Sequence, residues 1–260
     1  PATTQIEQVD VVPAWGHLYV GWNGQAIAPV GESVSNAELF RRLAGAMGYT
    51  EPELFTDDET LLAEALHRMS PERQAALRTD GFVRLDLPED HRPFATGGFA
   101  TASGKVELYS SALEARGHDP LPEYRPAAES PSGDPALFER FPLVLLTTKS
   151  HTRFLNSSYS HLPKHGPLEG GPFLEIDPAD AAARGIVDGT SVRVWNDRGQ
   201  LTLTARYSER VRPGVTSMPF GWWAKDEAGG GVANSLTNDT LSDWGGGVAY
   251  HDTLVQVAAV

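Results

Sequence analysis

The sequence predicts a mixed α/β protein in which a partial α/β segment precedes a closed barrel of six short strands. Helical periodicity is confined to the first third of the chain, and short strand patterns separated by turns follow residue 140. The 26 glycines and 19 prolines among 260 residues are typical of a globular chain rich in turns.

Two to three helices are expected near the start. Ser35 is a suitable N-cap for a helix over 36–48, which Gly48 ends. Asp57 and Asp58 open a second helix, whose expected buried positions are Leu61, Leu62, Ala65, Leu66 and Met69. Ser70 and Pro71 end it and begin a further helical turn.

Strand patterns follow these helices. Alternation over 82–87 predicts a strand, and residues 99–109 predict a hairpin that turns near Ser103 and Gly104. Prolines between 119 and 135 disfavour regular structure. We therefore expect an α/β segment over 1–118, a Pro-rich linker over 119–136 and a second domain over 137–260.

Six short strands are expected in the second domain. Asp177 and Pro178 begin a short helix between the second strand and the third, and Gly185 ends it. The turn at 197–199 joins two strands into a hairpin. The strands are predicted at 143–148, 173–176, 191–196, 200–207, 215–218 and 253–260.

Charge and composition exclude several classes of function. The net charge of −13 repels nucleic acid and anionic lipid. No cysteine is present, which excludes disulfides, iron–sulfur ligands and a thiolate nucleophile in this chain. No apolar run is long enough for a membrane segment. We expect a cytoplasmic protein, with periplasmic export of a longer parent left open, because the chain lacks an initiator Met.

Familiar catalytic motifs are incomplete. The glycines of 98–104 have the wrong spacing for a phosphate loop, and no GxSxG elbow occurs. His161 and His165 flank Pro163, which is incompatible with zinc ligands on one helix turn. No catalytic or metal-ligating residue is therefore predicted. The polar run 149–153 follows a predicted strand and indicates either an anion-binding loop or a solvated one.

An ordered set of segments resembles one family. FPLVLLTTKSHTRFLNSS begins at Phe141, FLEIDPADAAARGIVDGTSVRVWNDRGQLTLTARYSERVRPGVTSMPFGWW begins at Phe173, and NSLTND begins at Asn234. Upstream, ATASGKVELYS and PATTQIEQVD extend the likeness. Together they resemble the C-terminal molybdopterin-dinucleotide-binding domain of the dimethyl sulfoxide reductase family. The resemblance implies a double-psi β-barrel after a remnant of the catalytic α/β domain.

The resemblance also implies a cofactor and its contacts. Family members bind molybdopterin guanine dinucleotide, whose dithiolenes hold molybdenum or tungsten for two-electron chemistry. Trp223 is expected in the core instead. The cofactor-binding residues implied by position are Thr147, Thr148, Lys149, Ser150, His151, Thr152, Arg153, Asn156, Pro219, Gly221, Trp222, Asn234, Thr237 and Asp239.

Other parts of the enzyme are expected outside this chain. The resemblance places the metal ligand, and any iron–sulfur cluster, in a missing N-terminal part. The expected partners are therefore the remaining domains of a parent oxidoreductase and an electron-transfer partner that the sequence does not identify. The isolated chain is predicted to be inactive. A non-catalytic double-psi barrel that recognises a protein or peptide is the alternative.

Overall fold

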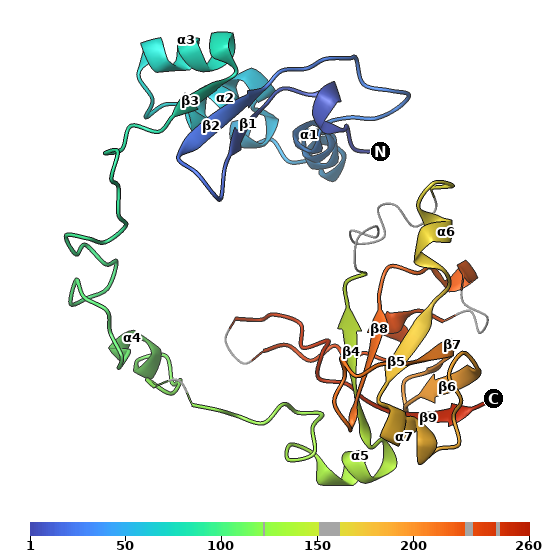
Figure 1. The fold of residues 1–260 in the computed structure, drawn as a ribbon. Coiled ribbons are helices and arrows are strands. Elements are labelled where there is room, and N and C mark those ends of the chain that lie inside the picture. The colour runs from blue at the N-terminus through green and yellow to red at the C-terminus, as the bar shows by residue number, and fades with distance from the viewer. Residues whose placement is uncertain (122, 151–161, 227–230, 243–244) are drawn as a thin grey trace. The chain divides into compact units, whose positions relative to one another are not determined.

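The protein is described by a computed structural model that covers residues 1–121, 123–150, 162–226, 231–242 and 245–260. The chain divides into two units, Pro1–Glu107 and Leu108–Val260. Figure 1 shows the elements of each in chain order. The sequence-based boundaries at 118 and 136 stay predictions.

A three-stranded antiparallel sheet and short helices form the first unit. The strands follow the order β1-β2-β3, and Val20, Leu66 and Leu77 are the buried residues of its core. The elements are η1 (Gln5–Glu7), β1 (Asp10–Pro13), β2 (Tyr19–Asn23), α1 (Asn36–Met47), η2 (Pro52–Phe55), α2 (Asp58–Ala65), α3 (Pro71–Asp80) and β3 (Phe82–Arg84).

The predicted helices are largely confirmed. The Ser35 hydroxyl accepts a hydrogen bond from the Glu38 amide, and Gly48 ends α1 with a φ of 80°, which an L side chain rarely adopts. Ser70 and Pro71 begin α3 as predicted. The predicted second helix was too long, because α2 ends at Ala65 and leaves Met69 beyond it.

The strand predictions in this unit were less accurate. β3 ends at Arg84, and β1 and β2 were not predicted. The predicted hairpin over 99–109 was wrong, because these residues form turns and bends. The side chains of Val106 and Leu108 are 65% and 81% exposed, so the two halves of that pattern have no apolar surface to pack on.

A closed barrel forms the second unit. The strand order is β4-β8-β5-β7-β6-β9, with β4–β8 and β5–β7 parallel and the other pairs antiparallel. The six predicted strands and the helix at Asp177 are confirmed. The elements are α4 (Ser111–Glu114), α5 (Pro135–Arg140), β4 (Leu143–Thr148), α6 (Gly166–Glu169), β5 (Phe173–Ile176), α7 (Pro178–Ala182), β6 (Ser191–Trp195), β7 (Gln200–Tyr207), β8 (Val215–Pro219), η3 (Ala224–Asp226), η4 (Ala233–Ser235) and β9 (Leu254–Ala259).

Alternation along each strand fills the barrel. In β4 every second residue is buried, beginning with Leu143 and ending with Thr147. Leu145, Leu174 and Val192 are completely buried in one continuous core. Thr147 therefore sits at the end of an inward-facing row, where the apolar core gives way to a polar side chain. In the part of the chain that the structure describes, no helix has the length and apolarity to cross a membrane.

Candidate functional site

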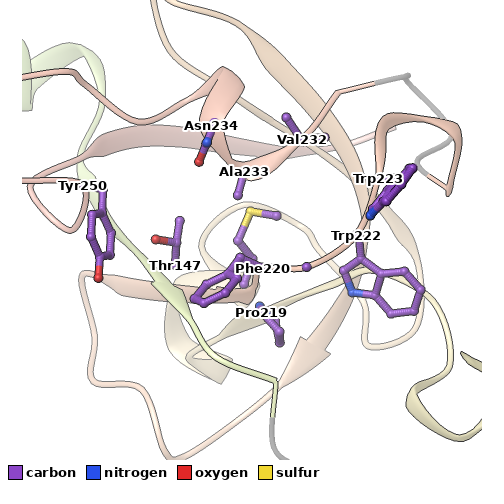
Figure 2. A pocket seen from close by; sticks show the side chains of 11 residues that line it. Thr147, Pro219, Phe220, Trp222, Trp223, Val232, Ala233, Asn234 and Tyr250 are labelled. Atoms are coloured by element: carbon purple, nitrogen blue, oxygen red, sulfur yellow. The ribbon is translucent and has the colours of Figure 1, made fainter. Parts of the chain in front are cut away.

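A pocket of about 510 Å³ opens at the end of β4 and β8. Figure 2 shows side chains from separate parts of the second unit arranged around it. Two segments, 218–223 and 232–234, and two single residues form its wall. The lining residues are Thr147, Met218, Pro219, Phe220, Gly221, Trp222, Trp223, Val232, Ala233, Asn234 and Tyr250.

The parallel pairing of β4 with β8 places the first part of this wall. Thr147 is opposite Met218 and Thr148 is opposite Pro219. The Phe220 amide donates a hydrogen bond to the Thr148 carbonyl at 2.9 Å, which extends the ladder beyond β8. The Thr147 side chain, which is 4% exposed, is therefore held beside Met218 and the start of the following loop.

The loop after β8 provides the aromatic part of the wall. Gly221 has a φ of 105°, in a region that an L side chain rarely adopts, so a glycine is needed for this turn. Trp222 and Trp223 follow it on the pocket wall. The expectation that Trp223 belongs to the core was wrong, because its side chain is 50% exposed.

The segment that contains η4 faces this loop across the pocket. Val232, Ala233 and Asn234 line the opening, and Figure 2 shows the Asn234 side chain extending towards the pocket. Thr237 and Asp239 follow in sequence but do not line it. The side chain of Asn238 between them is buried and donates hydrogen bonds to the carbonyls of Asp252 and Ala249, which anchors this part of the loop.

Thr148 and Lys149 line a second pocket, of about 490 Å³. Its wall includes Arg206 and Arg210, with Glu175 as the carboxylate, so cationic side chains outnumber acidic ones. The Arg206 guanidinium carbon lies 3.7 Å from the centre of the Phe173 ring. The remaining lining residues are Leu146, Leu168, Phe173, Val211, Ser217 and Pro219.

The predicted residues of the first loop are thus divided. Thr147 lines the first pocket, Thr148 and Lys149 line the second, and Ser150 lines neither. The predicted residues His151, Thr152, Arg153 and Asn156 lie outside the described part of the chain. Pro219 lines both pockets and lies between them.

Sequence reasoning missed several residues of the first pocket. Met218 and Phe220 flank the predicted Pro219, so the sequence indicated this segment but not that these two side chains line the pocket. Tyr250 precedes β9 and carried no motif. Its ring centre lies 4.4 Å from that of His251, and it lines the pocket from the segment that leads into β9.

This arrangement suits a flat heterocycle with polar edges. The rings of Trp222, Trp223, Phe220 and Tyr250 offer surfaces for stacking or edge contact. The Thr147 hydroxyl and the Asn234 amide can each donate and accept hydrogen bonds. Within the described ranges, no group of three or more His, Asp or Glu side chains is placed to hold a metal ion.

Comparison with known proteins agrees with this chemistry. Residues 143–254 match the family described as Molydopterin dinucleotide binding domain. The whole chain is 37% identical to the probable oxidoreductase YoaE of Bacillus subtilis and 32% identical to the dimethyl sulfoxide reductase DmsA of Escherichia coli. It covers only 37% and 35% of the lengths of those two proteins.

A solved structure shows the same architecture. Acetylene hydratase from Pelobacter acetylenicus matches the whole chain with a TM-score of 0.78 and 25% sequence identity. The chain covers 38% of that protein. Proteins named for sulfoxide reduction and for hydration of acetylene therefore both contain a region similar to this chain.

Proposed function

Because the chain belongs to the dimethyl sulfoxide reductase family, as the part that binds a molybdopterin dinucleotide, we propose that its first pocket receives the ring system at one end of that cofactor. The observation that carries the proposal is the convergence of Thr147, the 219–223 loop and the 232–234 segment on one opening. Hydroxyl, amide and aromatic groups at this opening fit a fused heterocycle with several nitrogen atoms.

The second pocket fits the charged middle of the same ligand. Arg210 pairs with Glu175 at 3.8 Å, so Lys149 and Arg206 carry the excess positive charge of this pocket, in a protein whose net charge is −13. A pyrophosphate group is the anion that links the two halves of a dinucleotide, and charge-assisted hydrogen bonds favour it. Pro219 borders both pockets, so a ligand that follows the end of β4 and β8 can reach each of them.

The cofactor supplies the redox chemistry and this chain supplies its orientation. When bound, the dinucleotide holds molybdenum or tungsten through dithiolene sulfurs and allows two-electron oxidation and reduction. The residues of this chain bind its polar edges, cover its rings and neutralise its phosphates. A guanine dinucleotide, a metal ligand from another domain and an electron-transfer partner complete the proposal for the parent oxidoreductase.

The type of reaction is set outside this chain. Relatives of the same barrel carry the names of a sulfoxide reductase and of an acetylene hydratase, so the barrel is compatible with different reactions. We therefore expect no turnover from the 260 residues alone. The recognition-module alternative is not favoured, because the dinucleotide-binding family covers residues 143–254.

The proposal is tested by measuring the dinucleotide retained by the full-length enzyme that contains this chain. The variant Lys149→Ala/Arg206→Ala removes two cationic groups that line the second pocket. Each lost charge-assisted hydrogen bond costs about 1.5–3 kcal/mol, so affinity for the dinucleotide should fall by roughly 10- to 100-fold per contact and less of it should be retained through purification. The purified protein is denatured, and the released pterin and nucleotide are quantified.

A matched variant controls for net charge. Lys105→Ala/Arg116→Ala removes the same two charges from positions that line neither pocket. It should retain the dinucleotide like the unmodified enzyme. Unchanged dinucleotide content in the Lys149→Ala/Arg206→Ala variant would contradict the proposed site.

A further inference from the structure

We infer that Arg198 and Glu129 are positioning residues that hold the 232–236 segment, and with it Asn234, at the mouth of the first pocket. The inference rests on the function proposed above. Neither residue lines the pocket, so each would act through this segment.

Arg198 connects the segment to two other parts of the second unit. It lies in the turn between β6 and β7, and its Nε donates a hydrogen bond to the Leu236 carbonyl at 2.7 Å. Its Nη1 and Nη2 donate to Glu129 Oε1 and Oε2 at 2.6 and 2.9 Å. The planar guanidinium thus uses one edge for the carboxylate and its Nε for the loop.

Glu129 ties the same arginine to the barrel wall. Its Oε2 accepts a hydrogen bond from the Leu254 amide, at the start of β9, at 3.1 Å. The Glu129 side chain is only 13% exposed, which shields this ion pair from solvent more than a surface pair. The Pro-rich linker that contains Glu129, the β6–β7 turn, the 232–236 segment and β9 therefore meet at one polar cluster.

Asn196 adds a second hold on the same carbonyl. Its Nδ2 donates to the Leu236 carbonyl at 2.8 Å and to the Leu254 carbonyl at 3.1 Å. The Leu236 carbonyl consequently receives donors from both Asn196 and Arg198. Since Leu236 is completely buried and lies two residues after Asn234, this anchor restricts the pocket segment directly.

Gly199 and Gly231 allow the backbone of the 231–236 segment to lie directly against the β6–β7 hairpin. A Cβ atom on Gly199 would lie 2.7 Å from the Ser235 carbonyl oxygen. A Cβ atom on Gly231 would lie 2.2 Å from Leu201 Cδ2 and 2.9 Å from the Gln200 carbonyl oxygen. No side chain fits at either crossing, so the position of the 231–236 segment is set by the hairpin next to it.

This cluster is separate from the strand pairing that closes the barrel. The ladders of β6 with β7 and β9 do not depend on the Arg198 side chain. Loss of that side chain should therefore release the 232–236 segment while the barrel stays closed. A role limited to general stability would instead affect all strands together.

The test compares Arg198→Met with Arg140→Met in the full-length enzyme. Met retains much of the apolar stem but removes every donor. Arg140 forms an ion pair with Asp197 in the same turn and contacts neither the 232–236 segment nor Glu129, so it is the matched control. Hydrogen–deuterium exchange is measured for peptides covering 231–240 and β5, together with the dinucleotide content.

We expect Arg198→Met to increase exchange of 231–240 by at least tenfold, to leave β5 exchange unchanged and to lower dinucleotide content. Arg198→Lys should restore part of both properties, because one ammonium group cannot bind Leu236 and Glu129 in the same way. Arg140→Met should match the unmodified enzyme. Unchanged exchange of 231–240 in Arg198→Met would overturn the inference.

The two proposals fail in different ways. Faster exchange with unchanged dinucleotide content would support positioning by Arg198 and would overturn the assignment of the first pocket to the cofactor. If Arg198→Met does not fold, Glu129→Gln provides a second route, because it removes the carboxylate that holds Arg198 and leaves the Arg198 side chain in place. Unchanged 231–240 exchange in that variant would likewise overturn the inference.

Discussion

Thr147 and Thr148 are neighbours in β4, yet their side chains line different pockets. Thr147 faces the end of the barrel core, while Thr148 Oγ1 lies 3.0 Å from Ser217 Oγ in the neighbouring strand. Adjacent strand residues point to opposite faces, which explains the division. A ligand that uses both pockets must therefore pass over the ends of β4 and β8.

Thr147→Val tests whether the Thr147 hydroxyl in the first pocket contributes to dinucleotide binding. Val has nearly the same shape but no hydroxyl, so it removes a hydrogen bond to the cofactor at little cost in packing. A neutral hydrogen bond contributes about 0.5–1.5 kcal/mol, which predicts a roughly 2- to 10-fold loss of affinity for the dinucleotide. Thr204→Val, at an exposed position of β7, is the control and should show no loss. Equal affinity in both variants would exclude a role for the Thr147 hydroxyl.

Lys149 should give dinucleotide binding its salt dependence. Salt screens exposed charges, with a Debye length of about 10 Å at 0.1 M. We expect the affinity of the full-length enzyme to fall as salt rises, and Lys149→Ala to flatten this dependence. Lys105→Ala should retain the dependence of the unmodified enzyme. Parallel curves for all three proteins would show that Lys149 does not face the phosphates.

Leu145→Ala should destabilise the barrel strongly. Leu145 is completely buried in the core, and a truncation of this kind costs about 2–5 kcal/mol. Leu146, the next residue, lines the second pocket and is only partly buried, so Leu146→Ala should cost less. Urea unfolding of both variants measures the difference. A larger loss for Leu146→Ala would contradict the inward direction of Leu145.

Glu7 should make the first unit sensitive to acid. Hydrogen bonds from the Thr4 amide and hydroxyl and from the Val30 amide lower the pKa of Glu7 from 4.5 to about 2. A lowered carboxylate pKa stabilises the fold above the ordinary pKa, and this contribution is lost as pH falls through the folded value. The stability difference between the unmodified protein and Glu7→Gln should therefore shrink between about pH 4.5 and 2.

Thermal unfolding at several pH values measures that difference. Glu32→Gln is the control, because it removes a nearby exposed carboxylate and leaves the hydrogen bonds of Glu7 intact. A difference between the unmodified protein and Glu7→Gln that stays constant from pH 7 to pH 2 would contradict the lowered pKa.

Local signals predicted the elements that local interactions define. Ser35 and Gly48 marked both ends of α1, and the run Leu143–Thr148, which begins with four apolar residues, indicated the buried strand β4. β1 and β2 lack such signals, since β1 ends in Pro13 and β2 contains Gly21. The pairing of β2 with β3 also joins residues that are far apart in sequence. The 99–109 pattern resembled a hairpin, but its apolar side chains Val106 and Leu108 are exposed and pack on no apolar surface.

The candidate site could be predicted only in part, and for the same reason. Resemblance placed Thr147, Pro219, Gly221, Trp222 and Asn234 together, and all five line one pocket. It could not separate Thr147 from Thr148, because that depends on which face of β4 each occupies. The contact of Arg198 with Glu129 joins the β6–β7 turn to the Pro-rich linker, and no spacing pattern in the sequence indicates it.

Strand β9 pairs with β4 on one side and β6 on the other, so the last strand of the barrel joins the first. During synthesis, β4 and β6 each keep one unpaired edge until β9 leaves the ribosome. Tyr250 and the Leu254 amide that contacts Glu129 arrive in the same late stretch. The proposed cofactor site is therefore complete only after translation has passed this strand, and a nascent chain stalled before it would be prone to aggregate through its unpaired edges.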